Sequence, residues 1–128
     1  MTRLLLVCLG GALGTGARYL LGGWIASAAG PGFPWGTLSI NATGSFLIGT
    51  VMYLGLDAGV VGPELRMVLA VGVLGGFTTY SSFNYETLAL LQRGAWGLAL
   101  VYVGATLLGC LAAGVLGVAA ARGVAGAW

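Results

Sequence analysis

The stretch GGFTTYSSFN, residues 75–84, decides how the chain folds. It lies in the middle of a long apolar segment, yet it contains two glycines and four serine or threonine residues. Serine and threonine prefer helix caps, and glycine weakens helix interiors. The stretch therefore predicts a helix that breaks near residues 75–79 and resumes as a second half-helix.

The sequence around this stretch has the composition of a membrane protein. Only 6% of its 128 residues are charged, and its mean hydropathy is +1.01, whereas soluble domains carry about 25% charged residues. A soluble fold of this chain would have almost no polar surface. The 25 glycines favour close approach of helices within a bilayer. The net charge of +2 is too small to indicate a nucleic-acid partner.

Four segments match the length of about 20 mostly apolar residues that a bilayer-spanning helix needs. We expect an all-α membrane protein with a single transmembrane domain over residues 1–128. Its four helices are expected at residues 4–25, 35–56, 64–91, with the break near 75–79, and 95–121. The opening MTRLLLVCLGG resembles a signal peptide, but its apolar pattern continues past Gly14, so we interpret it as a retained first helix.

A break at membrane depth has chemical consequences. Irregular backbone survives there only where protein or a cavity satisfies its polar groups. The first half-helix would end in free carbonyl groups, and such an end suits a cation. The alternative interpretation is a modest kink that binds no ligand.

All five cations are arginines, and they are nearly balanced between the two expected sides of the membrane. Arg3, Arg66 and Arg122 share one side, Arg93 lies on the other, and Arg18 is near the end of the first helix. Orientation follows the asymmetry of Lys and Arg between loops, so a chain this balanced is expected to insert either way round. Two oppositely inserted copies would then supply the symmetry that many transporters obtain from inverted repeats.

The second segment carries a polar stripe on one helical face. Thr37, Asn41 and Ser45 recur every four residues, and Asn41 falls near the middle of the membrane. An asparagine there needs a partner, because unsatisfied polar groups in hydrocarbon are costly. The stripe fits either an interhelical hydrogen bond that holds the bundle together or a line of donors along a pore. Tyr102 and Thr106 repeat the pattern more weakly on the fourth segment.

The residues that enzymes and metal sites most often use are scarce. The chain has no histidine, which is the commonest general base and metal ligand. Cys8 and Cys110 lie in apolar runs far apart, and we interpret them as small buried hydrophobic residues rather than a disulfide or a zinc site. With no paired acids and no nucleophile constellation, the sequence does not indicate an enzyme.

Three motifs together are similar to a known family. They are GGALGTGARY at residues 10–19, GTLSINATGSF at 36–46 and GGFTTYSSFNYE at 75–86. They resemble the Fluc/CrcB fluoride channels, and the resemblance covers nearly the whole chain. It implies a four-helix subunit that pairs as an antiparallel, dual-topology homodimer with two pores. It also implies passive fluoride export through the inner (plasma) membrane, which protects a microbe from toxic accumulation.

The resemblance also implies roles for individual residues. A structural sodium ion (Na+) at the dimer centre, where the breaks of both subunits meet, would be held by backbone carbonyls of Gly75 and Thr78. The fluoride pathway would comprise the pore amide of Asn41, the ring edges of Tyr80 and Phe83, a polar track of Thr37, Ser82, Tyr102 and Thr106, and Arg18 in an aqueous vestibule.

Two positions depart from the family's pattern. The first aromatic position is usually phenylalanine, and here it is Tyr80, which keeps the ring edge and adds a hydroxyl donor. Cys110 stands at the end of the polar track, where a hydroxyl residue is expected.

Two other classes of function remain open. A small multidrug-type proton-coupled cation antiporter is also a four-helix dimer of similar length, but it needs a membrane-buried carboxylate. The one intramembrane candidate is Glu86, which would otherwise pair a charge or support the second half-helix. A non-transporting scaffold protein fits the glycine-rich helices but gains nothing from polar helix faces or a broken helix.

Overall fold

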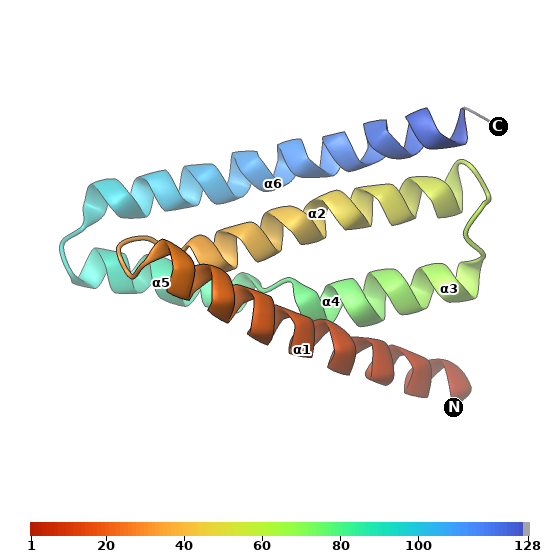
Figure 1. Ribbon diagram of the computed structural model, residues 1–128, viewed down its shortest axis with the longest axis horizontal. Coiled ribbons are helices and arrows are strands. Elements are labelled where there is room, and N and C mark those ends of the chain that lie inside the picture. The colour runs from red at the N-terminus through yellow and green to blue at the C-terminus, as the bar shows by residue number, and fades with distance from the viewer. Residues whose placement is uncertain (127–128) are drawn as a thin grey trace.

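Three long helices form the frame of the protein. The structure is a computed structural model that describes residues 1–126, and all regular structure within them is helical. The unbroken helices are α1 (Thr2–Ala29), α2 (Trp35–Leu56) and α6 (Trp96–Ala125). Each is long and apolar enough to cross a membrane. Figure 1 shows α2 and α6 side by side, while α1 crosses the other side of the bundle obliquely.

The third predicted segment is broken, as the 75–84 motif predicts. Its first half is a continuous helical run composed of α3 (Pro63–Met67), the π-helical η1 (Val68–Val73) and α4 (Leu74–Phe77). Its second half is α5 (Tyr80–Gln92). Between them, Thr78 and Thr79 are both extended.

The observed boundaries differ from the predicted ones in detail. α1 extends beyond both ends of the expected range 4–25, and α6 continues past residue 121 to Ala125. Gly75 and Gly76 lie inside α4, because the chain leaves helical geometry only at Thr78. The π-helical turn η1 has no counterpart in the prediction, since the apolar run 68–73 does not distinguish it from an α-helix.

Glycines bring α1 into direct backbone contact with the first half of the broken helix. A Cβ atom on Gly14 would overlap the carbonyl of Val73, and one on Gly76 would overlap the carbonyl of Gly11. Small residues permit this close approach between membrane helices. The contact fixes the carboxyl end of α4 relative to α1.

The same device joins α2 to α6. A Cβ on Gly49 would overlap the carbonyl of Gly114, and one on Gly117 would overlap the carbonyl of Phe46. The hydroxyl of Thr50 donates across this contact to the Gly117 carbonyl at 3.1 Å. The small residues of the sequence therefore mark helix contacts on both sides of the bundle.

The interpretation of Cys8 as a buried residue is wrong. Cys8 is exposed, whereas Cys110 is half-buried. α1 meets its neighbours through a stripe that includes Gly10 and Gly14. Cys8 precedes Gly10 by two residues, so it points to the opposite side of the helix.

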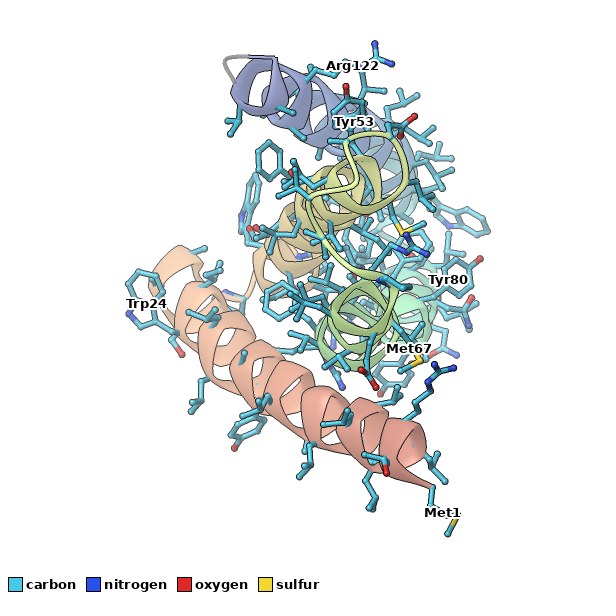
Figure 2. All side chains as sticks on the ribbon, turned by 90° about the vertical axis from the view of Figure 1, so that its right-hand side faces the viewer. Met1, Trp24, Tyr53, Met67, Tyr80 and Arg122 are labelled. Carbon is cyan, nitrogen blue, oxygen red and sulfur yellow. The ribbon has the colours of Figure 1, made fainter. Side chains whose placement is uncertain are left out.

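The start of α1 and the end of α6 lie at the same end of the bundle (Figure 1). α3 also begins there, so Arg3, Arg66 and Arg122 share this end, while the turn with Arg93 lies at the other. Figure 2 shows Arg122 beside Tyr53, and its guanidinium carbon is 5.4 Å from the ring centroid. Arg3, Arg66, Arg93 and Arg122 are thus divided between the two ends as the sequence predicts. Arg18, expected near the end of the first helix, instead lies well inside α1, because this helix continues to Ala29.

Candidate functional site

Asn41 of α2 binds the peptide at the helix break. Its Nδ2 donates to the Thr79 carbonyl at 3.0 Å, and its Oδ1 accepts from the Thr79 amide at 2.8 Å. In an unbroken helix that amide would donate to the carbonyl of Gly75, four residues earlier. Asn41 therefore replaces a helical hydrogen bond and deprives the Gly75 carbonyl of its usual donor. The interhelical bond that the sequence left as one alternative is present, and Asn41 is buried.

Thr79 starts the second half-helix. Its Oγ1 accepts from the Ser82 amide at 3.2 Å, the hydrogen bond of an N-cap. Its hydroxyl also donates to the Ser82 hydroxyl at 3.0 Å. Thr79 was expected only as the end of the break, although a threonine directly before an expected half-helix is a recognisable N-cap signal.

A cavity of about 430 Å³, here called the break cavity, lies beside this junction. It is bounded by residues of α2, η1, α4, α5 and α6 together with the break itself. Six of the predicted site residues line it: Asn41, Gly75, Thr78, Tyr80, Phe83 and Thr106. Ser45 and Cys110, which the sequence also places near the polar stripes, line it as well.

Thr106 has an unusual environment in the break cavity. Its residue is 7% exposed, and among residues 1–126 its Oγ1 is the one buried side-chain nitrogen or oxygen without a hydrogen-bond partner. Buried polar groups are nearly always paired. Thr106 therefore places, beside the break cavity, a hydroxyl whose hydrogen-bonding capacity the described part of the chain leaves unused.

The two aromatic residues lie at different depths. The ring centroids of Tyr80 and Phe83 are 5.5 Å apart, with the planes inclined at 60°. Phe83 is buried and also contacts the Tyr102 ring, at 5.2 Å between centroids. Tyr80 is 76% exposed, and Figure 2 shows it on the outer surface of the bundle. Phe83 therefore lines the cavity from within, and Tyr80 lies at its rim.

A second cavity, of about 300 Å³, lies between α1, α2 and α5, and is here called the α1 cavity. The predicted residues Arg18, Thr37 and Ser82 line it, together with Glu86. Thr79 lines both cavities, so the break separates them.

Glu86 links three helices beside the α1 cavity. Its Oε1 accepts from the Thr37 hydroxyl at 2.8 Å, and its Oε2 accepts from the Tyr102 hydroxyl at 2.6 Å. Tyr102 is fully buried and lines neither cavity. Glu86 was not expected in the polar track, although its position three residues after Phe83 puts both on one face of α5.

Arg18 contacts the end of the first half-helix. Its Nε donates to the Gly76 carbonyl at 3.1 Å, and the Thr15 hydroxyl donates to the same oxygen at 3.4 Å. The side chain is half-buried and lines the α1 cavity.

Within residues 1–126, no group of three or more histidine, cysteine, aspartate or glutamate side chains could hold a metal ion. Backbone carbonyls are the remaining candidates. The Gly75 and Thr78 carbonyls belong to residues that line the break cavity together.

Fold and site define a small helical membrane protein built around a helix that is broken between two cavities. Residues 5–118 match the family described as CrcB-like protein, Camphor Resistance (CrcB). The chain belongs to this family, which confirms the resemblance found in the three motifs.

Similar proteins cover nearly the whole chain. One from Anaeromyxobacter dehalogenans is 57% identical over 126 residues, which are 98% of this chain and 100% of the relative. One from Thermus thermophilus is 60% identical over 102 residues, 80% of this chain and 81% of the relative. One from Sorangium cellulosum is 47% identical over 122 residues, 95% and 96% of the two chains. All three are named Fluoride-specific ion channel FluC.

Proposed function

We propose that this protein is a fluoride-specific ion channel that lets fluoride leave the cell passively through the cytoplasmic membrane and so relieves fluoride toxicity. The names of its relatives supply the ion. One observation of the geometry carries the proposal: Thr106 lines the same cavity as Asn41 and Phe83, and its buried hydroxyl has no hydrogen-bond partner within residues 1–126. A donor without a partner in such a place suits an anion that has lost its water.

The lining chemistry fits a small, hard, strongly hydrated anion. Asn41 Nδ2 carries two hydrogens and commits one to Thr79, so the second is free to donate. The edge of the Phe83 ring bears the positive part of its quadrupole and attracts an anion weakly. None of these groups is a full charge, which would hold the ion too tightly for conduction.

A second copy of the chain would close the break cavity by packing over its exposed rim. Its rim includes the exposed side chains of Tyr80, Leu107 and Leu111, and its floor includes Asn41 and Thr78. Lipid on that rim would leave polar groups next to hydrocarbon, at considerable cost. We infer an antiparallel, dual-topology homodimer. In each subunit the broken third segment would cross the membrane together with α1, α2 and α6.

Labelling tests this topology. A single cysteine in place of Val60, which is exposed in the loop between α2 and α3, is introduced after Cys8 and Cys110 have been changed to serine. An impermeant thiol reagent should label about half of the molecules from each side of the membrane. Labelling from one side alone contradicts dual topology.

Sodium fits the carbonyl groups at the break. Because the Thr79 amide donates to Asn41, the Gly75 carbonyl is relieved of its helical partner. Unwound carbonyls of broken membrane helices coordinate Na+ in other folds. Each subunit of the proposed dimer would contribute the Gly75 and Thr78 carbonyls. The dimer fraction in detergent should rise when sodium replaces potassium, and an equal fraction in both salts contradicts the site.

Fluoride efflux from liposomes that contain the purified protein tests the function directly. Rapid efflux of fluoride, with chloride retained, is the expected result. Equal passage of both ions contradicts selectivity, and no passage contradicts the channel. Proton-coupled uptake of a cationic dye that is lost in Glu86→Gln would instead support the antiporter.

A further inference from the structure

We propose that Arg18 is a positioning residue: through its hydrogen bond to the Gly76 carbonyl, it holds the end of the first half-helix in the geometry that the break requires. This inference rests on the proposed function, because the break lies between the two cavities and its geometry would then affect the passage of fluoride. It assigns Arg18 a task that depends on a donor atom at one position, whereas attraction of anions would depend only on charge.

The helical run that ends at Phe77 has carbonyls that need donors from outside. The last carbonyls of any helix lack intrahelical partners, and α4 has no basic residue in its last turn. Arg18 supplies both a donor and a positive charge from α1, with Nε 3.1 Å from the Gly76 oxygen. A cation near a helix carboxyl end is also stabilised by the helix dipole.

The bond between Arg18 and the Gly76 carbonyl lies next to residues that line the break cavity. Gly76 is one residue from Gly75 and two from Thr78, and both of these line the break cavity. Asn41 holds the next peptide, that of Thr79, from α2. The break is therefore fixed from two helices. Without Arg18 the Gly76 carbonyl would keep only the longer bond from the Thr15 hydroxyl, at 3.4 Å, and the Gly75 and Thr78 carbonyls would be free to shift.

Two substitutions separate a donor from a charge. Glutamine carries Nε2 on Cδ, as arginine carries Nε, so Arg18→Gln keeps an N–H donor at the same distance along the side chain and loses the charge. Arg18→Lys keeps the charge but has a carbon at that position. Arg18→Met loses both. The exposed Arg3 of the same helix provides a matched control, Arg3→Gln.

The first measurement is the fluoride flux through liposomes as a function of fluoride concentration. Positioning predicts that Arg18→Gln lowers the saturating rate by less than about threefold, while Arg18→Lys and Arg18→Met lower it by about tenfold, in line with loss of a hydrogen bond to a buried carbonyl. Arg3→Gln should match the wild type. The opposite order, with lysine retained and glutamine impaired through a raised half-saturating concentration, overturns the proposal.

The second measurement is amide hydrogen exchange of the peptide that covers residues 74–84, in the protein embedded in lipid discs. Exchange should accelerate at least fivefold in Arg18→Lys and Arg18→Met but stay near wild type in Arg18→Gln. Equal exchange in all variants overturns the proposal. If the wild type conducts no fluoride, the proposed function fails, yet this exchange comparison still decides whether Arg18 positions the break.

Discussion

Replacing Thr106 with valine should make the protein more stable and less active at the same time. The hydroxyl of Thr106 is buried and has no hydrogen-bond partner within residues 1–126, so the folded protein bears its desolvation cost without compensation. Valine keeps the branched shape and removes the polar atom. If that hydroxyl donates a hydrogen bond to fluoride, its removal lowers the fluoride flux although it raises the free energy of unfolding.

The two magnitudes follow from ordinary hydrogen-bond energies. An unsatisfied buried donor costs about 1–3 kcal/mol, so Thr106→Val should raise the free energy of unfolding by about 1 kcal/mol or more. A hydrogen bond to a charged group contributes about 1.5–3 kcal/mol. Because about 1.4 kcal/mol corresponds to a factor of ten, its loss should lower fluoride flux roughly 10- to 100-fold.

The assay combines thermal unfolding in detergent with fluoride efflux from liposomes, and Thr50→Val is the matched control. The Thr50 hydroxyl donates to the carbonyls of Phe46 at 3.0 Å and Gly117 at 3.1 Å, and the residue lines neither the break cavity nor the α1 cavity. Its loss should cost about 0.5–1.5 kcal/mol of stability and change flux less than about twofold.

The predicted rise in stability and fall in flux distinguish this variant from a damaged protein. General damage to the fold lowers stability and flux together, as any failed variant would. A Thr106→Val protein with wild-type flux would refute the assignment of this hydroxyl to the ion path. A destabilised Thr106→Val protein would refute the claim that the hydroxyl is unpaired.

The remaining predictions concern the lining and the frame. Phe83→Ile should reduce fluoride flux strongly while the protein stays assembled, because the ring edge is lost and the volume is nearly kept; unchanged efflux removes Phe83 from the path. Asn41→Asp should also impair flux, since it replaces the donor to the Thr79 carbonyl with an acceptor; wild-type rates in that variant would show that conduction needs neither this bond nor the amide donor. Gly14→Ala should lower the unfolding midpoint clearly, because its Cβ would overlap the Val73 carbonyl; an unchanged midpoint would mean that α1 moves away at little cost.

Much of the fold could be predicted because membrane helices are constrained by length and composition. The second helix was expected at residues 35–56, and α2 is Trp35–Leu56. The break was expected near 75–79, and it lies at Thr78 and Thr79. Composition identifies a weak point in a helix well, because serine, threonine and glycine favour caps and turns over helix interiors.

The parts that could not be predicted depend on which side of a helix meets a neighbour. The exposure of Cys8 follows from the single contact face of α1, which composition does not reveal. The pairing of Glu86 with Thr37 and Tyr102 joins residues from three helices. Helical spacing could place each residue on a face of its own helix, but the relative rotation of the three helices was needed to bring them together.

The three sequence motifs converge on one junction, and this explains why they occur together. The first provides Arg18, which binds the Gly76 carbonyl, and the second provides Asn41, which binds Thr79. The second also provides Gly44, where a Cβ would overlap the Thr78 side chain. The third motif weakens its own helix at this point. The side chains that fix the resulting geometry from neighbouring helices come from the other two motifs. A broken helix within a membrane is stable only when its polar groups are satisfied, so the break is a property of three helices rather than of the segment that carries it.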